Sequence, residues 1–140
     1  MKLFLDTSVL LSACASTKGA SHFIIQQAKA NGWLLISAYY CREETRRNLS
    51  KLGSHASKFF NTQLERQINW LPNVLTTDKI VVYEKVKDRP VLMSALASKP
   101  SALLTLDRAD FHDRLGTQFY GIAIRTPGEW LTEQRKFGKL

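Results

Sequence analysis

Cysteine and long apolar runs are scarce in this 140-residue chain. Cys14 and Cys41 are its only cysteines, and no C-x-x-C spacing or histidine pattern accompanies them. This indicates neither a zinc site nor a disulfide framework, so we expect two reduced thiols. No segment has the roughly 20 apolar residues of a membrane span, and the apolar start of the chain is cut short at Asp6. The sequence therefore predicts a soluble, cytoplasmic protein with no membrane association.

Internal repeats, low-complexity tracts and linkers are also absent. Hydrophobic residues make up 44% of the chain, and a chain of this length can bury a core without disulfides or metals. We expect a single domain over residues 1–131, followed by a basic C-terminal tail over 132–140.

Acidic residues are in the minority. The chain has 12 Asp and Glu residues and 20 Lys and Arg residues, which gives a formal net charge of +8. The isoelectric point is accordingly near 9.7. A positive surface of this kind favours a polyanionic partner such as nucleic acid.

Short apolar stretches alternate with longer helical ones along the chain. Strands are predicted at residues 3–5, 33–37, 101–106 and 119–124. Helices are predicted just beyond Asp6, over 21–30, in two charged stretches at 38–52 and 54–68, and over about 88–98, 108–115 and 126–137. Residues 79–83 fit an edge strand or an extended loop. This alternation predicts an α/β fold, a single-domain α/β/α sandwich around a short, mainly parallel central sheet.

Carboxylates follow the predicted strands. Asp6 and Asp107 come directly after strands, so both are expected at the edge where parallel strands end and ligands bind in open α/β sheets. Glu44 lies about two turns into the helix that leaves the same edge. Asp88 precedes its helix, and it reaches this edge only if the chain segment before it leads to the carboxyl ends of the strands. The pattern predicts that four acids converge.

Each of these acids also has a simpler interpretation, because an Asp at a helix start can cap it. Four convergent carboxylates, however, repel one another unless a divalent cation neutralises them. Oxygen ligands alone favour Mg²⁺ or Mn²⁺. An acidic metal site on a basic protein is the arrangement expected of a nuclease, in which the ion polarises a phosphoryl oxygen and orients the attacking water.

Four segments resemble the PIN-domain nucleases, which include the VapC-like toxins. The segments FLDTSVLLSA, ISAYYCREETRRNL, KDRPVLMSALAS and ALLTLDRADF occur in the family's order and at about its separations. The resemblance spans roughly residues 2–131. It implies a PIN-like sandwich and a Mg²⁺- or Mn²⁺-dependent endoribonuclease that hydrolyses RNA phosphodiester bonds. It also implies the toxin role in a type II toxin-antitoxin pair.

The resemblance assigns the site residues as well. The catalytic, metal-binding quartet is Asp6, Glu44, Asp88 and Asp107; Ser8 and Thr105 fall where hydroxyl groups support the site, and Asp110 where an additional acid or polar group is common. Glu44 is chosen over its neighbour because it precedes Asn48 by four residues, as in the family. Adjacent helical residues point about 100° apart, so only one of the two can face the metal. Glu43 is the fallback.

Basic residues flank the expected acids. Arg42, Arg46, Arg89 and Arg108 are candidates for binding RNA phosphate, and each could equally pair with a carboxylate one helical turn away. Glu65 is expected to be a solvated charge. The expected partners are an RNA substrate, an antitoxin protein and a second copy of the chain. The alternative function is a non-catalytic or regulatory RNA-binding domain, whose RNA affinity falls with salt without metal-dependent cleavage.

Overall fold

A six-stranded sheet organises the part of the chain that the structure, a computed structural model, describes, namely residues 1–72, 89–107 and 116–140. Its strands are β1 (Lys2–Leu5), β2 (Leu34–Ala38), β3 (Asn69–Leu71), β4 (Ala102–Leu104), β5 (Gln118–Phe119) and β6 (Ile122–Arg125). The strand order is β3-β2-β1-β4-β6-β5. Every pairing is parallel except that of β5 with β6. The expected mainly parallel sheet is therefore confirmed.

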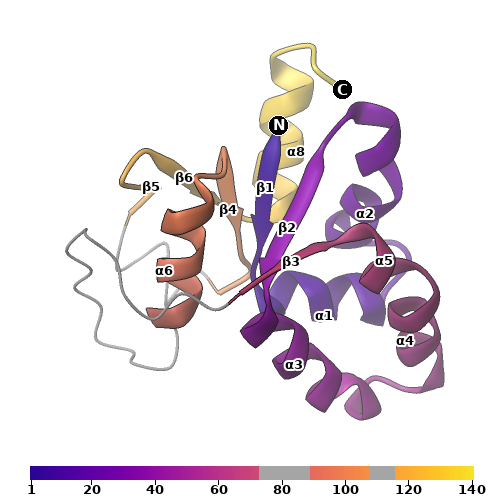
Figure 1. The fold of residues 1–140 in the computed structure, drawn as a ribbon. Helices are drawn as coiled ribbons and strands as arrows, with labels where there is room; N and C mark the ends of the chain where they lie inside the picture. Colours follow the sequence, from indigo (N-terminus) through magenta and orange to yellow (C-terminus); the bar gives the residue numbers. More distant parts are fainter. Residues whose placement is uncertain (73–88, 108–115) are drawn as a thin grey trace.

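Helices cover both faces of this sheet. They are α1 (Thr7–Ala15), α2 (Ala20–Asn31), α3 (Tyr39–Asn48), α4 (Ser54–Phe59), α5 (Glu65–Gln67), α6 (Arg89–Ser98) and α8 (Pro127–Lys136), with a 3-10 turn at Leu49–Lys51 and a π turn at Phe60–Leu64. Figure 1 shows α6 on one side of the sheet and α1 and α2 on the other, where α8 packs against α2. This is the predicted α/β/α sandwich. Within the described ranges, no helix is both long and apolar enough to cross a membrane.

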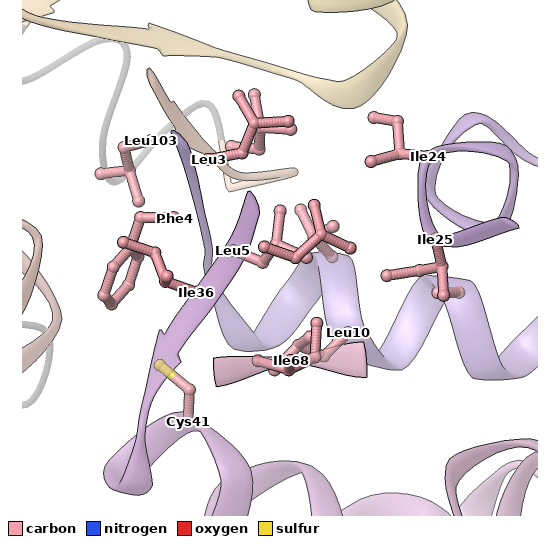
Figure 2. Close-up of a cluster of buried hydrophobic side chains, with 14 of the residues drawn as sticks. Leu3, Phe4, Leu5, Leu10, Ile24, Ile25, Ile36, Cys41, Ile68 and Leu103 are labelled. Carbon is pink, nitrogen blue, oxygen red and sulfur yellow. The ribbon is translucent and has the colours of Figure 1, made fainter. Parts of the chain in front are cut away.

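The central strand β1 supplies the core to both layers. Its alternating side chains point to opposite faces, and Leu3, Phe4 and Leu5 are all fully buried. In Figure 2, Leu3 and Leu5 lie on the side of Ile24 and Ile25 from α2, while Phe4 lies on the opposite side with Ile36 and Leu103. A strand buried on both faces needs a continuous apolar run, and that run ends at Asp6.

Local stop and start signals mark the end of α2 and the beginning of α8. Gly32 ends α2 with φ of 69°, the left-handed conformation that glycine adopts without steric cost. At the start of α8, Thr126 Oγ1 accepts the Glu129 N–H at 3.1 Å, and Glu129 Oε1 accepts the Thr126 N–H at 2.9 Å. This reciprocal capping box satisfies two backbone donors at a helix end.

Two strand predictions need correction. The single strand expected at 119–124 is a hairpin in which β5 and β6 are joined through Tyr120 and Gly121, with φ of 49° and 81°. Two consecutive positive φ angles reverse the chain in a two-residue turn. The strand β3 was not predicted. Its three residues pair with the end of β2, and so short a segment carries too little alternation to be recognised.

Some expectations meet the structure differently or fall outside it. Helix α8 continues to Lys136, so it runs across the expected start of the tail at 132. Residues 79–83 and the helix expected at 108–115 lie outside the described residues.

The β5–β6 turn provides a test of backbone strain. Gly121→Ala forces a Cβ into the positive-φ conformation although nothing lies within 4 Å of the added atom, so we expect the free energy of unfolding to fall by about 1 kcal/mol. Gly128→Ala is the matched control, because Gly128 is also unobstructed but lies in α8 without positive φ; it is expected to be neutral or stabilising. Urea denaturation measures both. Equal losses would contradict the assigned turn.

The buried thiol of Cys14 provides a pH test. Burial raises the pKa of Cys14 to about 12, whereas an unfolded cysteine ionises near about 8.5. Above that pH the unfolded chain loses a proton that the folded chain keeps, so stability falls as pH rises, by up to about 1.4 kcal/mol per pH unit. We expect Cys14→Ala to show a shallower decline in unfolding free energy above about pH 9 than the wild type. Parallel declines would refute this assignment.

Candidate active site

The site lies at the carboxyl edge of the three central strands. Leu5 at the end of β1 is in register with Leu104 at the end of β4, and the Asp6 N–H donates to the Leu104 carbonyl at 3.0 Å. The residues that follow the two strands are therefore neighbours. On the other side of β1, strand β2 ends at Ala38 and leads directly into α3, which lies at this edge in Figure 1.

The Asp6 carboxylate is buried at this edge, with 6% of the residue exposed. Its Oδ1 accepts the Thr7 N–H at 2.8 Å, so Asp6 is the N-cap of α1. Its Oδ2 accepts hydroxyl hydrogen bonds from Ser8 at 3.0 Å and Thr105 at 2.9 Å. These donors favour the charged carboxylate, which would otherwise be costly to bury.

The same two hydroxyls position the chain after β4. Ser8 Oγ accepts the Leu106 N–H at 3.0 Å, and Thr105 Oγ1 accepts the Asp107 N–H at 3.0 Å. Each hydroxyl therefore donates to Asp6 and accepts from the loop that carries Asp107. Sequence reasoning placed Ser8 and Thr105 here as supporting groups, and in the structure they join two chain segments about 100 residues apart.

The second expected acid lies on α3, whose residues Cys41 and Thr45 form the buried stripe. Glu44 is one turn beyond Cys41 and half-buried. Within the described residues, its carboxylate makes no ion pair. Glu43 differs, since its side chain is 56% exposed and pairs with Arg42 at 3.1 Å. Of these two adjacent acids, Glu44 is therefore the one whose carboxylate makes no ion pair within the described residues.

The Cys41 thiol of α3 lies near enough to Asp6 to be influenced by its charge. It is fully buried, and its pKa is raised to about 12, mainly by burial and also by the nearby Asp6 charge, while the Ser37 hydroxyl opposes the rise. The thiol is therefore neutral at physiological pH and places no second negative charge beside Asp6. Ser37 itself donates to the Leu5 carbonyl at 2.7 Å, which ties β2 to the end of β1.

Arg42 and Arg46 are both engaged by one carboxylate. The Arg42 Nε donates to Glu65 Oε1 at 2.9 Å, its Nη2 contacts the same oxygen, and Arg46 Nη1 lies 3.3 Å from it. Glu65 is thus not a solvated charge. Its position on α5, far along the chain, could not be read from helical spacing. The pairing with α5 is a structural role for both arginines, and their binding to RNA remains a prediction.

Several candidate residues fall outside the described residues. Asp88, Asp110 and Arg108 are among them, and of Arg89 only the backbone is placed, as the first residue of α6. In the described ranges, no group of three or more His, Cys, Asp or Glu side chains is close enough to hold a metal ion. Of the expected residues, the structure brings together Asp6, Ser8, Thr105 and the backbone of Asp107.

The donor set nevertheless suits one class of ion. Asp6, Glu44 and Asp107, the expected acids that lie in the described part of the chain, all carry carboxylate oxygens, and the Cys41 thiol near Asp6 is buried and neutral. Oxygen donors without sulfur or imidazole ligands fit hard cations such as Mg²⁺ or Mn²⁺.

The fold is similar to that of a chain in the crystal structure of VapBC2 from Rickettsia felis bound to a DNA fragment from their promoter. The similarity covers 90% of this chain and 98% of that chain, with a TM-score of 0.63 and 11% sequence identity. No family model and no curated protein matches the sequence. At this identity the likeness establishes the fold, and the fold agrees with the PIN-like architecture that the sequence motifs predict.

The hydroxyl of Thr105 allows a direct test of this network. Thr105→Val keeps the side-chain shape but removes the donor to Asp6 and the acceptor for the Asp107 N–H. We expect the free energy of unfolding to fall by about 1 to 3 kcal/mol, because buried polar groups lose their partners. Thr132→Val is the control: its hydroxyl donates to the Gly128 carbonyl on the exposed face of α8, and the change should stay within about 0.5 kcal/mol. Similar losses of unfolding free energy in the two variants would show that the buried hydrogen bonds of Thr105 do not contribute to stability.

Proposed function

We propose that this protein is a Mg²⁺- or Mn²⁺-dependent endoribonuclease that acts through Asp6, Glu44, Asp88 and Asp107. The observation that carries the proposal is the buried Asp6 carboxylate, held by Ser8 and Thr105 at the carboxyl edge of the sheet. Capping α1 requires only one carboxylate oxygen of Asp6 and does not require hydrogen bonds to the second oxygen. Fixing the second oxygen and the Asp107 backbone through the same hydroxyls supports a role in holding a ligand at this edge.

The chain's own residues have distinct tasks in this proposal. Asp6, Glu44, Asp88 and Asp107 would hold the ion, which when bound polarises the phosphodiester and activates water. Ser8 and Thr105 orient Asp6 and set the backbone of Asp107 before substrate arrives, so that the carboxylates need not reorganise. Asp110 would add a further polar group. The neutral Cys41 keeps the site's negative charge confined to the carboxylates.

The substrate class rests on charge, and the biological role rests on likeness. A net charge of +8 favours a polyanion, and the motif resemblance specifies RNA. The fold shared with VapBC2 supports the toxin role of a toxin-antitoxin pair, in the cytoplasm. An antitoxin protein and a second copy of the chain are then the proposed partners. A non-catalytic RNA-binding domain is the alternative, and it predicts RNA binding without metal-dependent cleavage.

The Asp6→Asn variant tests the proposal. Asn caps helices as well as Asp does, so the fold should persist, while the lost charge should reduce Mn²⁺-dependent cleavage of single-stranded RNA by about 100-fold or more. Asp107→Asn is expected to behave alike, and EDTA should abolish wild-type cleavage. Gel analysis of a labelled RNA measures the rates, and circular dichroism checks folding. Equal cleavage by wild type and Asp6→Asn would refute the site, and wild-type binding without cleavage would favour the alternative.

The adjacent acids on α3 provide a matched pair. Glu44→Gln should reduce cleavage strongly, because it neutralises a proposed ligand. Glu43→Gln removes the same charge one residue away, from an exposed side chain whose pair with Arg42 is worth little, and should leave the rate nearly unchanged. A larger defect in Glu43→Gln would assign the second acid to Glu43.

A further inference from the structure

Helix α3 separates its charged residues onto different flanks. Cys41 and Thr45 face the core, and the residues one position later, Arg42 and Arg46, lie on the flank that meets Glu65 of α5. Residues at 100° intervals place Glu44 on the opposite side of the buried stripe. Arg47 lies next to it on that flank, one turn further along.

The arginines on the α5 flank are already committed. Both contact Glu65 Oε1, and the Arg46 guanidinium also lies 5.9 Å from the centre of the Phe60 ring. A phosphate that recruited either residue would have to break an ion pair that connects α3 to α5. These contacts favour a structural role over substrate binding.

Arg47 differs from these two arginines in its surroundings. It is exposed, and within the described residues its guanidinium makes no ion pair. Glu44 lies three residues earlier, at a spacing that permits a helical ion pair, yet the two side chains do not form one. Glu44 and Arg47 thus lie one turn apart on the same flank of α3, and neither makes an ion pair with another described residue. The acid is available for a cation and the base for an anion.

We propose that Arg47 is a substrate-positioning residue that binds a phosphate of the RNA next to the phosphate attacked at the acidic site. This inference rests on the proposed function and names a residue for it. A planar guanidinium suits a phosphate, to which it can donate two parallel hydrogen bonds. Arg47 acts by orienting the strand, whereas Arg42 and Arg46 hold the helix on which Glu44 is carried.

The competing explanation is that Arg47 only stabilises its helix. Both Arg46 and Arg47 lie in the last turn of α3, where a positive charge interacts favourably with the helix dipole. Arg46→Ala is therefore a closely matched control for Arg47→Ala. It removes the same charge from the same turn, but it also breaks the ion pair between Arg46 and Glu65.

The experiment measures binding of a fluorescent single-stranded RNA oligonucleotide in EDTA, over a series of salt concentrations. For Arg47→Ala, we expect the slope of log K against log salt to shrink by about 0.7, the value for one phosphate contact on a single strand. This corresponds to about fivefold weaker binding at about 0.1 M salt. Arg47→Lys keeps the charge and should restore the slope. Arg46→Ala should instead lower the melting temperature and leave the slope unchanged.

Kinetics supply a second readout. With Mn²⁺ present, Arg47→Ala should raise KM with little change in kcat, because a phosphate contact made equally in substrate and transition state contributes uniform binding. Equal slopes for Arg47→Ala and wild type, or equal slope changes for Arg47→Ala and Arg46→Ala, would overturn the inference while leaving the nuclease assignment intact. Wild-type protein that neither binds nor cleaves RNA would instead overturn the proposed function, and the inference with it.

Discussion

The hydrogen bonding of the Asp6 carboxylate is the interaction on which the site depends. A carboxylate with 6% exposure is tolerable only when donors replace the water it has lost, and here a backbone N–H and two hydroxyls do so. Because Ser8 follows β1 and Thr105 follows β4, satisfying this one charge also joins two adjacent strands where they end. The same hydroxyls then receive backbone N–H groups from the loop that carries Asp107. The same hydroxyls therefore satisfy the Asp6 charge and position the backbone of Asp107.

Helix α3 carries Glu44, the second acid of the proposed site, and is held in place by other contacts. Its buried stripe sets the rotation of the helix, and the Arg42 and Arg46 contacts with Glu65 keep that rotation. Those positive charges are held on the α5 flank, whereas Glu44 makes no ion pair within the described residues. Glu44 lies two residues from each of these arginines, a spacing at which helical side chains do not face each other.

Much of the fold was predictable because its signals are local. The apolar run of β1 ending at Asp6, the Gly32 stop and the Thr126 capping box each act within a few residues. The hairpin at Tyr120 and Gly121 was missed because an apolar stretch with a single glycine resembles a continuous strand. Strand β3 was missed because it depends on pairing with β2, not on a pattern of its own. The motifs predict Ser8 and Thr105 as supporting residues, but the atoms that their hydroxyls connect could not be deduced from spacing.

The sequence by itself determined the alternation of strands and helices, the positions of carboxylates after strands and the excess of positive charge, since each is a property of neighbouring residues or of the whole composition. Only the tertiary structure decided which partners each polar group found. Asp6 meets Thr105 across 99 residues, and Glu65 gathers two arginines from another helix. Such contacts form because burial demands a partner for every charge, and the partner is chosen by packing of distant segments, which linear spacing does not encode.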